Sequence, residues 1–209
     1  MGILKSGILG GFRKKLGPAI GRRHMGQNLI SALPHKSTKP ATSKQLETQV
    51  KLGLLNGFLS TIDKLVNIGF NQYVKHNTEV NAAFSYNYKH AFVKDGEAWL
   101  INYPKIIYSR GHIVAPEMPQ LVMEGEKITF RWLPQNQSAY CQFTDLASFL
   151  VYCPSEGSAI ILLNAVNRYA KSYTIEIPAH YFNQTLHCYM NFNSGNGKIV
   201  GDSVYVGVL

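Results

Sequence analysis

The chain has 209 residues, of which 45% are hydrophobic and 16% charged, a balance that excludes a disordered protein and suffices for one or two cores of domain size. Its formal net charge is +9 at pH 7. Up to Gln45 there are nine basic and no acidic residues, and the remainder balances 12 basic against 12 acidic residues. Such one-ended charge is typical of a segment that contacts nucleic acid, an acidic protein or a membrane surface.

Residues 1–41 are predicted to be a basic, glycine-rich arm and linker. Seven glycines between positions 2 and 26 lie too close together for a stable helix, because each interior glycine costs up to ~1 kcal/mol. Large apolar residues alternate with the glycines, so we expect an extended arm that becomes ordered against a partner or against the rest of the chain. Its glycines are expected where backbones approach closely or where φ is positive. Six basic residues are the candidate contacts to that partner: Lys5, Arg13, Lys14, Lys15, Arg22 and Arg23.

Residues 42–94 are predicted to form a pair of helices. Thr42 and Gln45 have the spacing of a capping box, and apolar residues then recur every three or four positions to about Phe70. Gly53 and Gly57, four residues apart on this helix, predict the close packing of another segment. A second, shorter helix is expected from a cap at Asn77 or Thr78 to about Val93.

Residues 95–209 are predicted to be a β-sandwich, which makes the whole chain α+β. The turn signal Asp95-Gly96 marks a change of period, and seven short apolar strands separated by turn residues follow the PEMP segment at 116–119. This spacing favours a Greek-key sandwich over a barrel or a parallel α/β sheet. The run LHCYMNFNSGNGKIVGDSVYVGV resembles the F and G strands of a fibronectin type III or immunoglobulin-like module, with Trp132 in the place of its B-strand tryptophan.

No pattern of catalytic or metal-binding residues stands out. None of the seven histidines forms an H-E-x-x-H motif, and no G-x-S-x-G or P-loop motif occurs. A carboxylate pair assembled from residues distant in sequence remains open. Cys141, Cys153 and Cys188 have no partner at zinc-ligand spacing, so we expect reduced, packed side chains. We therefore expect a non-enzymatic protein without a metal or cofactor.

Targeting signals are also missing from the sequence pattern. Positive charges interrupt the apolar residues of the first 26 positions every few residues, unlike a secretory signal peptide. No stretch approaches the roughly 20 apolar residues that cross a bilayer. We expect a location in the cytoplasm or inside a virion or other particle, without a membrane partner.

The order of these parts resembles a known family. GILGGFRKKLGPAIGRRHMGQNLISALP, STKPATSKQLETQVKLGLLNGFL, VNIGFNQY, AAFSYNYKHAF and the ending GDSVYVGVL are similar to an uncharacterised family, a domain of unknown function of about 200 residues found in Bacteroidota. A glycine-rich basic start followed by Pro40, Thr42 and Gln45 at a helix start also resembles hypothetical proteins of phages and prophages. The first resemblance spans nearly the whole chain and implies no catalytic residue.

Three hypotheses about function follow. The leading one is a structural or accessory protein of a phage-like or other multi-subunit assembly, attached through the basic arm to protein partners or to further copies of itself. The second is a nucleic-acid-binding accessory protein. The third is a ligand- or protein-binding sandwich, with a pocket near the loops 134–140 or 194–198.

Overall fold

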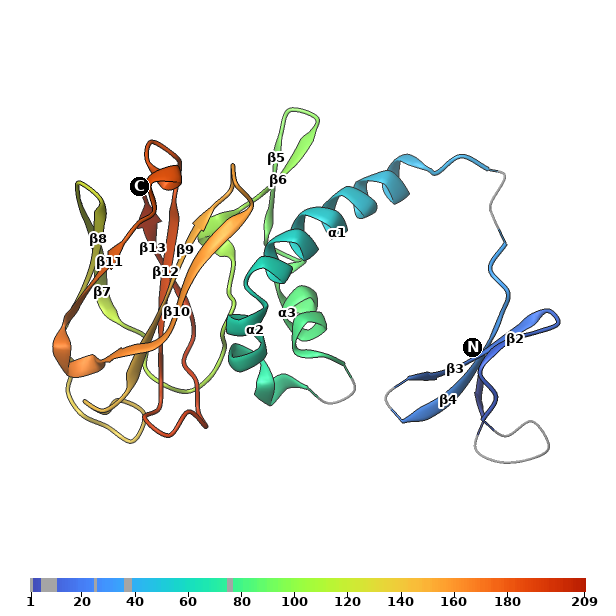
Figure 1. Ribbon diagram of the computed structural model, residues 1–209, viewed down its shortest axis with the longest axis horizontal. Helices are drawn as coiled ribbons and strands as arrows, with labels where there is room; N and C mark the ends of the chain where they lie inside the picture. The colour runs from blue at the N-terminus through green and yellow to red at the C-terminus, as the bar shows by residue number, and fades with distance from the viewer. Residues whose placement is uncertain (1, 5–10, 25, 36–38, 75–76) are drawn as a thin grey trace. The chain divides into compact units, whose positions relative to one another are not determined.

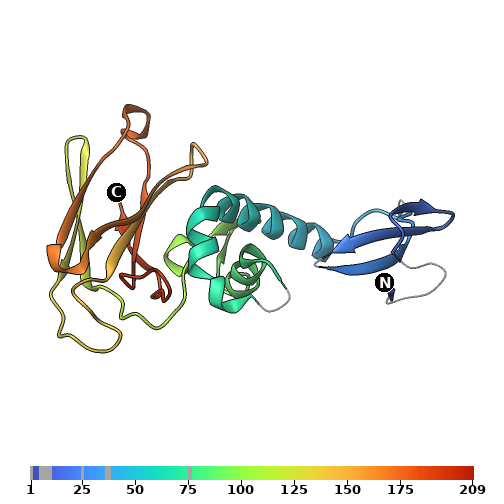
Figure 2. The same cartoon turned by 60° about the horizontal axis from the view of Figure 1, so that its bottom comes forward.

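The computed structural model describes residues 2–4, 11–24, 26–35, 39–74 and 77–209 (Figures 1 and 2). The chain divides into two compact units, residues 1–43 and residues 44–209. The fold is mixed and mostly β, with antiparallel sheets, as the sequence predicts. Among the described residues, no helix is long and apolar enough to cross a membrane.

The first unit is a small antiparallel sheet of strand order β1-β4-β3-β2, where an extended arm is predicted. Its strands are β1 (Gly2–Leu4), β2 (Lys14–Leu16), β3 (Ala19–His24) and β4 (Gln27–Ala32). The glycines make the tight turns possible: Gly17 and Gly26, between successive strands, have φ values of 56° and 79°. At Gly21 a side chain would collide with the backbone and ring of Phe12, so this glycine permits close packing.

The second unit begins with helices α1 (Ser43–Thr61), α2 (Asp63–Gly69) and α3 (Glu79–Asn87) and the 3₁₀ turn η1 (Asn71–Tyr73). The predicted first helix is therefore interrupted at Ile62. Thr78 caps α3, its hydroxyl accepting a hydrogen bond from the Asn81 N–H at 3.3 Å. That helix ends earlier than predicted because 92–95 pair as a strand instead.

A hairpin of β5 (Phe92–Asp95) and β6 (Ala98–Ile101) follows, with the predicted turn at Gly96, where φ is 58°. The expected boundary between residues 94 and 95 falls inside this hairpin. The 3₁₀ turn η2 (Tyr103–Lys105) follows this hairpin. Two further 3₁₀ turns lie between later strands, η3 (Arg168–Ala170) and η4 (Ala179–Tyr181).

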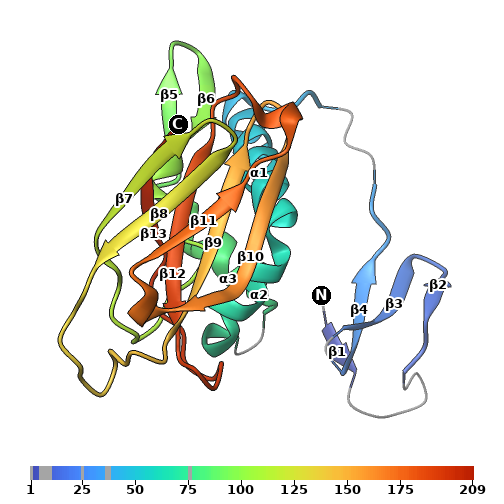
Figure 3. The same ribbon diagram turned by 60° about the vertical axis from the view of Figure 1, so that its left-hand side comes forward.

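Two larger sheets complete the second unit, with strand orders β11-β8-β7 and β10-β9-β12-β13. Their strands are β7 (Glu117–Glu124), β8 (Lys127–Leu133), β9 (Leu146–Cys153), β10 (Ser158–Asn167), β11 (Ser172–Glu176), β12 (His187–Asn193) and β13 (Val204–Val208). Figure 3 shows the β11-β8-β7 sheet in front of the other sheet and the helices behind it.

Each face of the β10-β9-β12-β13 sheet is covered by its own hydrophobic cluster. One face packs on the smaller sheet, where Phe130 and Trp132 of β8 meet Phe149 and Phe192. The other face packs on the helices through Leu150, Tyr152 and Tyr189. Strand β9 is buried on both sides, which explains its nearly continuous apolar sequence. The helices thus form part of the same core as the sheets.

Two details of α1 differ from the sequence prediction. Its apolar stripe is buried only in the second half, from Leu55 onward, whereas Leu46 and Val50 are about half exposed, at 52% and 49%. No segment of the second unit packs closely at Gly53 or Gly57, where such packing is predicted, because a Cβ at either position would meet none of that unit's described atoms within 4 Å. Cys141, Cys153 and Cys188 are free and buried, as predicted.

Candidate interaction surfaces

The predicted basic contact residues gather on two neighbouring strands of the first unit. Lys14 and Lys15 lie on β2, and Arg22 and Arg23 lie on β3, with Lys14 opposite Gly21 and Lys15 opposite Ile20. All four are exposed, as is Arg13 immediately before β2. We call residues 13–24 the basic ribbon. Lys5, the sixth predicted contact, lies outside the described residues.

The ribbon distributes its charge over both faces of the sheet. Arg22 and Arg23 are successive residues of one strand, so their side chains leave from opposite faces. Because β2 is an edge strand, its lysines also discourage pairing with another strand. The ribbon can therefore contact an anionic partner, but it does not form a single flat basic face.

A second candidate surface lies where three loops of the second unit meet. We call it the loop end: residues 134–145 between β8 and β9, the turn η3, and residues 194–203 between β12 and β13. An open depression of about 580 Å³ lies there, in the region that the third hypothesis names. Its polar lining includes Gln142, Thr144, Asp145, Ser194 and Asn196.

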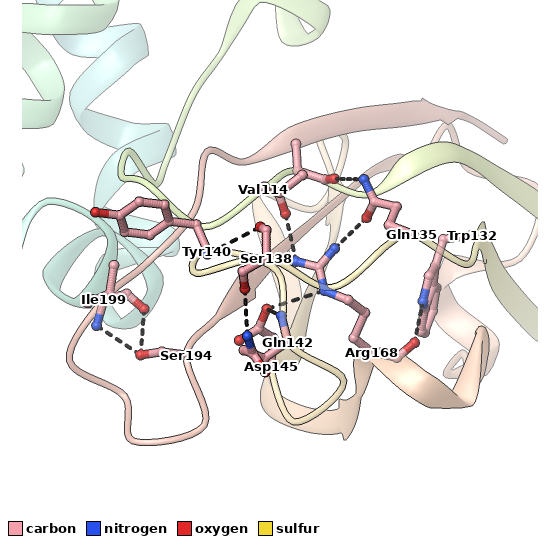
Figure 4. Close-up of polar contacts among 11 residues, drawn as sticks. Val114, Trp132, Gln135, Ser138, Tyr140, Gln142, Asp145, Arg168, Ser194 and Ile199 are labelled. Carbon is pink, nitrogen blue, oxygen red and sulfur yellow. Dashed lines mark hydrogen bonds and ion pairs between the residues drawn. The ribbon is translucent and has the colours of Figure 1, made fainter.

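Arg168 holds this loop end together from the inside (Figure 4). Its guanidinium donates hydrogen bonds to the Gln135 side-chain oxygen and, at 2.7 Å, to the Val114 carbonyl oxygen. Its Nε lies 3.3 Å from a carboxylate oxygen of Asp145, in an ion pair without hydrogen-bond geometry. Both side chains of that pair are only 2% exposed. One charged residue thus connects three segments far apart in sequence.

The backbone of Arg168 extends the same network. Its N–H donates to the Asp145 carbonyl oxygen at 2.7 Å, and its own carbonyl oxygen accepts from the Trp132 indole N–H at 2.9 Å. The guanidinium carbon also lies 3.8 Å from the centre of the Phe192 ring. Burial lowers the pKa of Arg168 from its ordinary value, and the negative charge of Asp145 opposes that shift. The charge is used internally, so Arg168 orders the loops and is not offered to a ligand.

Exposed aromatic side chains project from these ordered loops. The rings of Phe143 and Tyr169 meet edge to face at 5.6 Å, and Tyr169 is 64% exposed. Tyr140 is 48% exposed and contacts His112, with ring centres 5.8 Å apart. Aromatic residues on a rigid support are typical of the energetically dominant contacts in protein interfaces. The loop end is therefore suited to a protein partner.

One cluster of titratable side chains lies on the face of the larger sheet that packs on the helices. His187 stacks on Tyr103 with ring centres 3.9 Å apart, and its Nδ1 lies 3.0 Å from the Tyr205 hydroxyl. Burial lowers the pKa of His187, which favours the neutral imidazole. No carboxylate among the described residues forms an ion pair with this histidine. The geometry is that of aromatic packing, and the predicted lack of enzymatic activity stays a prediction.

The described residues also contain no group of three or more His, Cys, Asp or Glu side chains placed to hold a metal ion. Burial raises the pKa of the Cys188 thiol to about 12, so this cysteine is unreactive at neutral pH.

A family comparison agrees with the resemblance found in the sequence. The pattern of a family of unknown function, DUF6266, matches residues 11–207. The chain belongs to this family. The match includes the basic ribbon as well as the loop end, so both surfaces are parts of the DUF6266 region. No curated protein and no solved structure matches the chain. The Bacteroidota origin and the likeness to phage proteins stay predictions.

Proposed function

We propose that this chain is a non-enzymatic structural or accessory protein of a multi-subunit assembly, such as a phage-like particle of Bacteroidota, located in the cytoplasm or within the particle. The separation of charge between two compact units carries this proposal. Residues 1–43 hold eight basic and no acidic residues, and residues 44–209 hold 13 basic and 12 acidic ones, which together account for +9. The first unit attaches the chain to anionic protein surfaces, and the second presents its loop end.

The proposal includes a fibronectin-type-III-like sandwich in the second unit. The support is the strand order: in chain order, the first, second and fifth strands form one sheet, and the third, fourth, sixth and seventh form the other. Trp132 is buried in the core between the two sheets. It lies on β8, the second of the seven strands, which corresponds to the B strand of the fibronectin-like resemblance. Modules of this architecture commonly bind partners with the loops at one end.

Deletion of residues 1–40 tests the attachment. The shortened chain keeps Thr42 and the whole of α1, so it is expected to fold, with a melting temperature within a few degrees of that of the full chain. Both chains, produced in the native host with the same C-terminal tag, are compared by size exclusion with light scattering. The full chain is expected in a complex well above 23.4 kDa, and the shortened chain outside it.

A folded shortened chain that still enters the complex would contradict attachment through the first unit. A full chain that elutes alone from its native host would contradict the assembly role itself.

A second candidate function, nucleic-acid binding, is favoured by the basic ribbon. Five described cations lie exposed within twelve residues, and the first 45 residues contain no acidic side chain to repel phosphate. Two-stranded ribbons of this kind are among the structures that enter DNA grooves. The distribution of charge over both faces suits contacts to the backbone more than base reading.

Replacing Lys14, Lys15 and Arg23 with glutamine tests this candidate. If each contacts one phosphate, the slope of log K against log salt concentration should decrease by about 2.7 for duplex DNA, at about 0.9 for each lost contact, and by about 2.1 for a single strand, at about 0.7 for each. Fluorescence anisotropy with labelled duplex DNA and with single-stranded RNA measures the slope.

The matched control replaces three exposed cations of the second unit, Lys64, Lys105 and Lys171, with glutamine. It removes the same net charge and should leave the slope unchanged. Equal slopes for both triple variants, or no binding by the intact chain at low salt, would exclude nucleic-acid binding through the ribbon.

A further inference from the structure

An open depression of about 510 Å³ lies in the helical layer of the second unit. Arg110 follows the segment that contacts the end of α2, and its backbone N–H donates to the Gly69 carbonyl oxygen at 3.0 Å. Its guanidinium carbon lies 4.1 Å from the ring centre of Tyr86, on α3, and 4.7 Å from that of Tyr73, on η1. Two tyrosine rings therefore fix the position of this guanidinium. We call the depression the Arg110 pocket.

The guanidinium has no anionic partner in the part of the chain that the structure describes. Ion pairs there are limited to Lys51–Glu47, Lys127–Glu176 and Arg168–Asp145. Arg168, by contrast, has its charge balanced by the buried carboxylate of Asp145. The Arg110 side chain is only partly exposed. The two tyrosine rings beside it do not replace a counter-ion that accepts hydrogen bonds from the guanidinium.

Lys89, which also lines the pocket, adds to its positive charge. Lys89 and His90, just after the end of α3, line it together with Asn77 and Ser85, and no acidic residue does. The guanidinium carbon lies over both rings, and no hydrogen bond joins a guanidinium N–H of Arg110 to another residue that the structure describes, so these donors are available to a ligand. Planar, fork-shaped donors of this kind match the oxygens of a phosphate.

We propose that the Arg110 pocket binds the phosphate monoester group of a small organic ligand. Arg110 supplies the paired N–H donors, Lys89 adds a point charge, and Asn77 and Ser85 supply neutral hydrogen-bonding groups. A volume of about 510 Å³ is in the range of small-molecule sites and exceeds the space that a bare phosphate ion occupies. The proposal is independent of the assembly role and of the basic ribbon.

The test uses the full chain and three probes: phenyl phosphate, inorganic phosphate and acetate. Proton NMR of the aromatic region and isothermal titration calorimetry follow the binding. Phenyl phosphate is expected to bind more tightly than either ion and to shift the ring resonances of Tyr73 and Tyr86. Arg110→Gln is expected to weaken its binding about tenfold or more, since a charge-assisted contact is lost.

Two control variants separate binding from folding. Arg110→Lys keeps the charge without the fork and should lie between the wild type and Arg110→Gln in affinity. Arg131→Gln changes an exposed arginine of β8 and should bind like the wild type. If Arg110→Gln is unfolded by near-UV circular dichroism, Lys89→Gln takes its place, with a smaller expected loss.

No binding of phenyl phosphate at 10 mM, or the same affinity in Arg110→Gln and the wild type, would overturn the site. Equal affinity for acetate would overturn the phosphate assignment, and equal affinity for inorganic phosphate would overturn the organic ligand.

Discussion

Replacement of Arg168 by methionine is expected to lower the free energy of unfolding by about 3–5 kcal/mol. Methionine keeps much of the apolar contact with Phe192 but leaves the Asp145 carboxylate without its buried counter-charge. The carbonyl oxygen of Val114 and the side-chain oxygen of Gln135 also lose their donors. Urea unfolding, followed by the fluorescence of Trp132 and Trp99, measures the change.

Two comparisons identify the buried charge as the cause. Asp145→Asn in the Arg168→Met background removes the unpaired charge, while its side-chain oxygen can still accept from the Gln142 N–H, as Asp145 does at 2.8 Å. This double variant should recover part of the loss. Lys127→Met breaks an exposed pair with Glu176, at 3.2 Å, and should cost no more than about 1 kcal/mol.

A loss below 1 kcal/mol in Arg168→Met would show that the network contributes little to stability. The loop end would then need another explanation for its order. If the double variant loses as much free energy of unfolding as Arg168→Met, the main contribution of Arg168 to stability is its hydrogen bonds to the neutral oxygens of Val114 and Gln135.

The sequence predicts the strands of the second unit well because their signal is local. Alternation in KITFRW places Ile128, Phe130 and Trp132 on one face, and these residues are buried together in the core. Tyr173 and Ile175 follow the same rule on β11. Turn residues such as Gly96, Gly125 and Gly157 have φ values of 58°, and each marks a boundary that composition alone indicates.

The Arg168 network was not predictable in this way. Arg168 and Asp145 are 23 residues apart, and each stands in a connection between two strands. Their burial depends on how two loops and the segment around Val114 meet after the sheets have packed. No spacing rule connects such residues, because the distance between them is set by tertiary structure.

In the first unit the sequence predicts the positions of the glycines but not the strands between them. These glycines occupy positions of positive φ or close approach, as the sequence predicts, at Gly17, Gly26 and Gly21. The strands between them are short and mostly exposed, so hydrophobic alternation is weak and the sequence predicts an extended arm instead of a sheet. The basic residues follow from composition alone, but their distribution over two faces follows only once residues 19–24 are known to form a strand, on which Arg22 and Arg23 point to opposite faces.

Gly69→Ala is expected to lower the free energy of unfolding by about 3 kcal/mol, at the upper end of the usual cost of overpacking. Gly69 has no positive φ, so backbone strain is not the reason. The added Cβ would collide with the Tyr108 carbonyl oxygen and with Ser109. That segment cannot withdraw easily: the Tyr108 N–H donates to the Ser203 hydroxyl at 2.9 Å, and the Ser109 hydroxyl donates to the Gly201 carbonyl oxygen at 2.7 Å.

The same substitution in α1 should have the opposite sign. Gly53 is exposed inside a helix, and a Cβ there meets nothing within 4 Å, so Gly53→Ala should raise the free energy of unfolding by about 0.5–1 kcal/mol through the higher helix propensity of alanine. Thermal and urea unfolding of both variants give the comparison. If Gly69→Ala is as stable as the wild type, α2 and residues 108–109 do not pack as closely as described. If Gly53→Ala is destabilised, α1 is covered at Gly53 in the folded chain, and the close packing inferred from the sequence would be restored.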